Sequence, residues 1–202
     1  MAVLSFADLG QRERKQLLRI ARESIAHGLP DAGPRTIAPD EFAGALARAG
    51  ASFVTLRLDA ALRGCVGSIE ARRPLAIDVT QAAFNAAFRD ARFPPLTMTE
   101  FPDVEIEISV LSGMIRINAR DQDELLQTLR PRIDGLLLED ARRRATFLPK
   151  VWEQLSDPRE FLAALMLKAG LGEGYWSPTL RVFRYQTLCF DEHTVQDETR
   201  HT

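Results

Sequence analysis

The sequence predicts an α+β fold in which a largely antiparallel sheet is flanked by helices. Helix and strand patterns alternate irregularly, hairpin signals are evident, and no βαβ rhythm with a glycine-rich dinucleotide fingerprint occurs. The 202 residues are 46% hydrophobic and 27% charged, which provides enough apolar material for a sizeable core without oligomerisation. We therefore expect a single domain over residues 1–190 and a polar, frayed tail over residues 191–202.

The first expected element is an amphipathic helix over residues 7–26. Ser5 and Asp8 have the spacing of a capping box, and apolar residues recur at helical spacing behind them. Gly28 and Pro30 are expected to end this helix, and an irregular connection follows.

A hairpin and a second helix come next. Residues 52–58 are rich in β-branched and aromatic side chains, and after a short turn residues 62–69 can return alongside them. Pro74 suits a first helical turn, and small side chains line one face of the following segment. We therefore expect residues 74–90 to form a helix that packs closely on a sheet.

The remaining segments predict alternating strands and helices. Strict alternation of apolar and polar residues makes residues 104–110 the clearest strand of the chain. The other expected elements are a helix over 121–130, strands over 135–139 and 144–148, a helix from Asp157-Pro158 to Gly170, and a last strand over 180–190.

One predicted strand carries a thiol between two glycines. Gly64 and Gly67 flank Cys65, which suggests a bulge or a close approach of the backbone to another group. Arg63 would share a face with Cys65 in a regular pleat, and a nearby cation favours the nucleophilic thiolate. The alternative is a buried cysteine that acts as a small hydrophobe, which is the commoner role of free cysteine.

A second polar cluster lies at the end of the predicted helix over 74–90. Arg89, Asp90, Arg92 and Phe93 lie between the helix end and a proline pair, and arginines in such a place can bind a carboxylate or phosphate. The alternative is an ion pair between Asp90 and an arginine that closes the helix, with the aromatic side chains anchoring the loop.

Several classes of site are disfavoured by composition. The only histidines are His27, His193 and His201, so a Ser-His-Asp or Cys-His pair would need a residue at a helix end or in the tail. Cys65 and Cys189 are the only cysteines, and neither belongs to a Cys-x-x-Cys pair. We therefore expect no metal and no other cofactor.

Charge and hydropathy also limit the expected partners. The formal net charge is −2, and the run Arg142 to Arg144 follows two acidic residues, so the sequence disfavours nucleic-acid binding. The longest apolar run, Phe161 to Leu167, is far shorter than the roughly 20 residues of a membrane span. No leader of signal-peptide type precedes the first helix. We expect a cytoplasmic protein without membrane association.

Several motifs in a fixed order carry a family resemblance. They are Leu62-Arg63-Gly64-Cys65-Val66-Gly67, the segment Ala86 to Leu96, the segment Glu105 to Ser112, Gly135 to Leu138, Phe147-Leu148-Pro149, Phe161-Leu162 and Lys168 to Leu171. In these motifs the chain resembles the AMMECR-one family, whose prokaryotic form is called AmmeMemoRadiSam system protein A. The similarity runs from about Phe53 to Phe190, with Val66 and Phe147 as mild departures, and does not include the tail.

This resemblance implies a fold with two unequal lobes and a cleft bordered by the Arg-Gly-Cys segment. It also implies association, by gene grouping, with a Memo-type protein and a radical-SAM protein, whereas no reaction is established for the family. Three alternatives follow: an accessory or enzymatic component of that system that takes a small anionic ligand, a non-catalytic interaction module, or a regulatory nucleic-acid-binding protein. The candidate catalytic residues are Cys65 and Arg63, and the candidate ligand-binding residues are Gly64, Gly67, Arg89, Asp90, Arg92 and Phe93.

Overall fold

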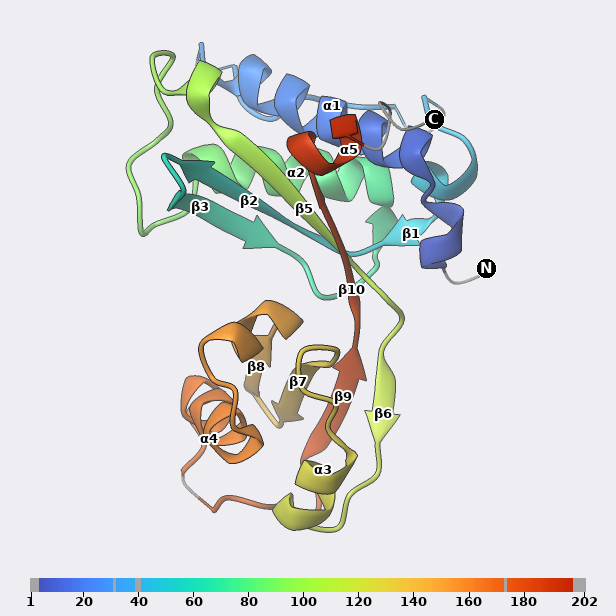
Figure 1. Ribbon diagram of the computed structural model, residues 1–202, viewed down its shortest axis with the longest axis vertical. Coiled ribbons are helices and arrows are strands. Elements are labelled where there is room, and N and C mark those ends of the chain that lie inside the picture. The colour runs from blue at the N-terminus through green and yellow to red at the C-terminus, as the bar shows by residue number, and fades with distance from the viewer. Residues whose placement is uncertain (1–3, 31, 39–40, 173, 198–202) are drawn as a thin grey trace. The chain divides into compact units, whose positions relative to one another are not determined.

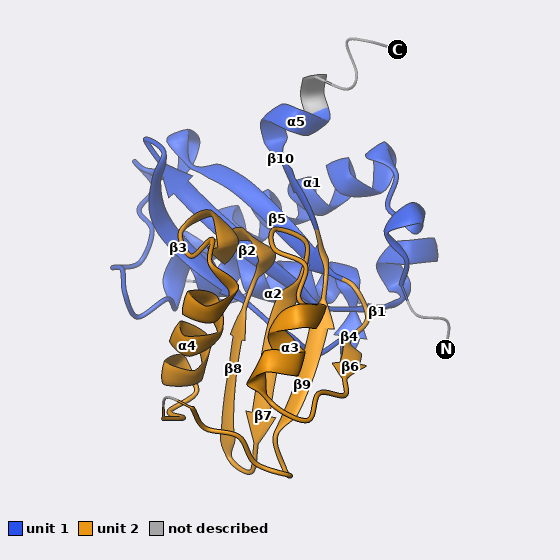
Figure 2. Ribbon diagram, turned by 60° about the horizontal axis from the view of Figure 1, so that its bottom comes forward, with its two compact units in different colours: residues 1–111, 188–202 blue, residues 112–187 orange. Residues whose placement is uncertain are grey.

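The computed structural model describes residues 4–30, 32–38, 41–172 and 174–197 (Figure 1). The chain divides into two compact units, each with its own hydrophobic cluster (Figure 2). Unit 1 comprises Met1–Leu111 and Leu188–Thr202, and unit 2 comprises Ser112–Thr187. Antiparallel sheets flanked by helices confirm the predicted α+β class.

Unit 1 is built on a four-stranded sheet with the order β10-β5-β2-β3. β2 pairs antiparallel with both of its neighbours, β3 and β5, and its pairing with β3 is the predicted hairpin. β3 therefore lies at an edge of the sheet. The strands are β2 (Ser52–Leu58), β3 (Ala61–Gly67), β5 (Glu105–Leu111) and β10 (Thr187–Asp191).

Two helices pack on each other and cover one face of this sheet (Figure 1). They are α1 (Gln11–Gly28) and α2 (Leu75–Phe88), and the buried small residues of α2 confirm the predicted close packing. At Gly64 of β3, a Cβ atom would lie 2.1 Å from the carbonyl oxygen of Ala86 in α2. The missing side chain therefore lets the backbone of the helix approach the backbone of the strand.

Both ends of unit 1 differ from the prediction. The capping box of Ser5 and Asp8 belongs to a separate 3-10 turn, so α1 begins only at Gln11. The tail begins with a helix, because Asp191 Oδ1 accepts the N–H groups of His193 and Thr194, the second and third residues of that helix. Residues 198–202 lie outside the described part. The minor elements of unit 1 are η1 (Phe6–Asp8), η2 (Gly44–Ala47), β1 (Ala49–Gly50), β4 (Arg73–Pro74), η3 (Phe101–Asp103) and α5 (Glu192–Asp197).

Unit 2 contains a second four-stranded antiparallel sheet with the order β6-β9-β7-β8. Its core is anchored by Trp152, whose ring stacks on Phe161 at 3.8 Å and whose indole N–H donates to the Asp134 carbonyl oxygen at 2.7 Å. The elements of unit 2 are β6 (Ile115–Ile117), α3 (Gln122–Thr128), β7 (Gly135–Asp140), β8 (Arg143–Phe147), η4 (Pro149–Glu153), α4 (Pro158–Lys168) and β9 (Arg181–Tyr185).

The predicted last strand over 180–190 is wrong in one respect, because it forms two strands. β9 belongs to the sheet of unit 2 and β10 to the sheet of unit 1, with Gln186 between them. The backbone of Gln186 is held by Ser112, which donates its N–H to the Gln186 carbonyl at 2.9 Å and accepts the Gln186 N–H on its hydroxyl at 2.9 Å. Within the described residues, none of the helices has the length and apolar character of a membrane span.

Candidate functional site

Cys65 lies on the edge strand β3, where its backbone is bonded by two side chains. The N–H of Cys65 donates to Asp90 Oδ2 at 2.9 Å, and Arg92 Nη2 donates to the Cys65 carbonyl oxygen at 3.2 Å. In a wider sheet, a neighbouring strand would form hydrogen bonds with this N–H and this carbonyl group. Here the Asp90–Arg92 ion pair takes the place of that strand. The two sequence clusters at 63–67 and 89–93 thus meet at Cys65.

The ion pair itself has bidentate geometry. Arg92 Nε lies 2.9 Å from Asp90 Oδ1, and Arg92 Nη2 lies 2.6 Å from Asp90 Oδ2. These bonds from Arg92, followed by the N–H of Cys65, hold the pKa of the buried Asp90 carboxyl far below its usual range. Asp90 therefore stays ionised at neutral pH and is fully engaged, which leaves it no role as a general base.

The thiol of Cys65 faces away from α2. Because the missing side chain of Gly64 would meet α2, the next residue points to the opposite face of the sheet. There the Thr55 hydroxyl donates to Cys65 Sγ at 3.3 Å, and the side chain of Cys65 is half-buried. Glu107 follows Thr55 across the sheet in the same row. The site therefore presents a partly accessible sulfur beside a hydroxyl group.

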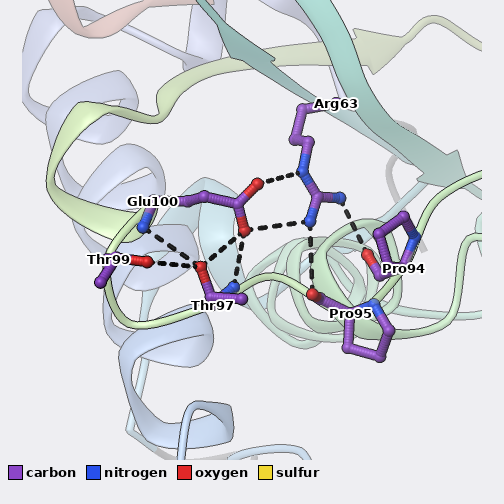
Figure 3. A network of polar contacts seen from close by, with 6 residues as sticks. All are labelled: Arg63, Pro94, Pro95, Thr97, Thr99 and Glu100. Carbon is purple, nitrogen blue, oxygen red and sulfur yellow. Dashed lines mark hydrogen bonds and ion pairs between the residues drawn. The ribbon is translucent and has the colours of Figure 1, made fainter.

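Arg63 is held elsewhere, by the loop that precedes β5 (Figure 3). Its Nε donates to Glu100 Oε1 at 2.8 Å and its Nη1 donates to the Pro94 carbonyl oxygen at 2.9 Å. The register of the hairpin shifts at this point, so Arg63 is the extra residue of a β-bulge and its side chain is re-aimed. Arg92, rather than Arg63, supplies the guanidinium beside Cys65.

The other predicted ligand residues have packing contacts. A Cβ atom at Gly67 would lie 2.2 Å from the Ser52 carbonyl oxygen, so glycine is needed for close strand packing. The Phe93 ring lies under the Arg92 guanidinium, 5.4 Å from ring centroid to Cζ. Arg89 lies instead over the Phe84 ring at 5.1 Å.

A buried carboxylate at the end of β3 was missed by the sequence analysis. Asp78 of α2 accepts the N–H and the hydroxyl of Ser52 at 2.8 and 2.7 Å and the hydroxyl of Ser68 at 2.9 Å. Burial raises the pKa of Asp78, although these hydrogen bonds oppose the shift. The available signal was an acidic residue placed among the small residues of an apolar helix face.

A small polar pocket of about 70 Å³ adjoins this carboxylate. Gly67 and Ser68 line it from the strand side, and Asp78 and Asn85 line it from α2. Arg73 reaches the same pocket and contacts Asp78 at 3.5 Å. Its volume suits one or two water molecules rather than an organic ligand. In the described part of the chain, no three His, Cys, Asp or Glu side chains gather as metal ligands would.

Several known proteins are similar to this chain over most of its length. A protein of Methanothermobacter thermautotrophicus is 33% identical over 191 residues, which cover 94% of this chain and 99% of the relative. A protein of Thermofilum pendens is 35% identical over 203 residues, covering 94% of each. The crystal structure of an uncharacterised protein of Pyrococcus horikoshii matches with a TM-score of 0.78 and 29% identity, over 88% of this chain and 90% of that one. The AMMECR1 family model matches residues 18–190, and the chain therefore belongs to the AMMECR1 family.

Proposed function

We propose that the chain is a cytoplasmic component of a three-part system with a Memo-type protein and a radical-SAM protein, and that it contributes the thiol of Cys65. In this function the sulfur acts as a nucleophile or a covalent carrier, and Arg92 attracts an anionic group of the substrate. The observation that carries the proposal is the double attachment of the Cys65 backbone to the Asp90–Arg92 pair, which fixes a half-buried thiol at the sheet edge.

The same contacts favour a thiol site over a docking edge for another strand. A peptide that extended the sheet would need the outward N–H and C=O groups of β3. At Cys65 both of these groups are already bonded to Asp90 and Arg92. The Arg92 side chain is nevertheless 56% exposed, so it can approach an incoming group while it keeps its ion pair.

Co-purification from the native cell tests the proposed assembly. A tagged full-length chain is isolated as wild type, as Cys65→Ser and as the matched Cys189→Ser, which changes the other cysteine. We expect the Memo-type and radical-SAM proteins with all three forms, because a serine leaves the surface unchanged. We also expect a mass increase on Cys65 in wild type and in Cys189→Ser but not in Cys65→Ser.

The two parts of the proposal fail separately. Absence of both partners from all three preparations would contradict the three-part assembly. Presence of both partners, together with full function of Cys65→Ser in cells that lack the wild-type chain, would instead make the chain a non-catalytic interaction module.

A further inference from the structure

Unit 2 contains a pocket of about 450 Å³ that shares no residue with the Cys65 site. Arg184 of β9 projects from the sheet where that strand pairs with Ile115 of β6. Arg130 and Asp134 approach from the segment between α3 and β7. Met114 completes an apolar side of the pocket next to Ile115.

Arg184 is the unusual residue of this pocket. Its side chain is half-buried, and its Nε atom is buried without a hydrogen-bond partner. Among the residues that the structure describes, the guanidinium has no ion pair, hydrogen bond or ring contact. Because buried donors are nearly always bonded, the Arg184 guanidinium is available to a partner from outside the protein.

The other charges of the pocket cancel. Arg130 Nη2 lies 2.6 Å from Asp134 Oδ1, and Arg130 Nε lies 3.1 Å from Asp134 Oδ2, so this pair is bidentate and self-sufficient. Asp134 is fully buried and also accepts the backbone N–H of Arg130. The pocket therefore has one uncompensated positive charge, on Arg184.

We propose that this pocket binds an organic carboxylate, with the guanidinium of Arg184 as its anchor. A carboxylate carries the single negative charge that balances Arg184, and its two oxygens match a planar guanidinium. A phosphate monoester carries about −1.5 to −2 charges, which is more than the single positive charge of Arg184 balances. The inference is independent of Cys65.

The apolar side of the pocket selects the rest of the ligand. Ile115 is 55% exposed although it is a large hydrophobic residue, and Met114 lies beside it. Volumes of about 300–1,000 Å³ are usual for small-molecule sites, so the pocket has room for a short apolar chain or ring. The predicted ligand class is a monocarboxylate with an apolar body.

Calorimetric titration of the full-length chain with hexanoate tests this proposal. Arg184→Gln removes the charge and preserves much of the side-chain shape, and Ile115→Glu places a negative charge at an exposed position of the same pocket. Arg116→Gln is the matched control, because Arg116 is an exposed arginine on β6 that does not line the pocket. Hexanol serves as the uncharged probe of the same length.

We expect hexanoate to bind wild type and Arg116→Gln equally, and hexanol to bind neither. Arg184→Gln and Ile115→Glu should each weaken hexanoate binding by about tenfold or more, since a hydrogen-bonded charge contact is lost or opposed. Arg184→Gln should also melt at or above the wild-type temperature without ligand, because an unpaired charge has been removed. No binding of hexanoate to wild type, or equal binding to wild type and both pocket variants, would overturn the proposal.

Discussion

Two arginines of unit 1 form similar ion pairs but have different surroundings. Arg63 is 9% exposed and ties β3 to the loop through Glu100 and two proline carbonyls. Arg92 is largely exposed and lies against the backbone of Cys65. The sequence identified both residues, but it assigned the cation beside the thiol to Arg63. The two glycines predicted a bulge in this strand, but its position at Arg63 depends on strand register, which local sequence does not specify.

Replacement of Glu100 by glutamine tests the structural role of Arg63. Hydrogen bonds from Arg63 first, and then from Thr97, lower the pKa of Glu100 to about 2. Glu100→Gln should lower the free energy of unfolding at pH 7 by about 2 kcal/mol, a value typical of hydrogen bonds to charged groups. Urea denaturation measures this difference, with the exposed Glu153→Gln as the control.

The pH dependence follows from the direction of that shift. A carboxyl whose pKa is lowered in the folded state stabilises the fold above its unfolded pKa, and this contribution is lost as pH falls toward the folded value. The stability difference between wild type and Glu100→Gln should therefore shrink between about pH 5 and pH 2. A difference that stays constant over this interval would show that the ion pair with Arg63 adds no stability.

At the scale of elements, α2 determines the geometry of the site. It contacts β3 at Gly64, supplies the buried Asp78 carboxylate to Ser52 and Ser68, and leads at its end to Asp90. Periodicity and small residues predicted this helix within two residues at each end. Its hydrogen bonds to the sheet could not be predicted, because they join residues that are distant in sequence.

Gly64→Ala tests the close contact between α2 and β3. The added Cβ atom would lie 2.1 Å from a backbone oxygen that cannot move independently of its helix. We expect the free energy of unfolding to fall by about 3 kcal/mol or more, the upper range for overpacking. Gly172→Ala is the matched control, because nothing lies within 4 Å of its added Cβ atom. Thermal or urea unfolding measures the loss of stability. An equal loss in Gly64→Ala and Gly172→Ala would contradict the contact between Gly64 and α2.

At the scale of the whole molecule, the chain forms two units and returns to the first. Unit 1 is completed by β10, which comes after all of unit 2. The sequence over 180–190 has continuous strand character and therefore predicted one element. The division at Gln186 depends on its backbone bonds to Ser112 and on the pairing of each half with a different sheet. Such long-range pairing is not encoded in local periodicity.

The central claim is that the fold presents Cys65 as a reactive thiol, and alkylation rates test it most directly. Mass spectrometry follows iodoacetamide labelling of Cys65 in the folded full-length chain and in urea, with the exposed Cys189 as internal reference. Arg92→Gln removes the adjacent cation, and Arg89→Gln is its matched control on the same segment.

We predict that iodoacetamide labels Cys65 in the folded chain, because its half-buried side chain leaves the sulfur partly accessible. Arg92→Gln should slow this labelling by about threefold or more, and Arg89→Gln should leave it unchanged. Labelling of Cys65 only when the chain unfolds would contradict the claim and identify a structural cysteine.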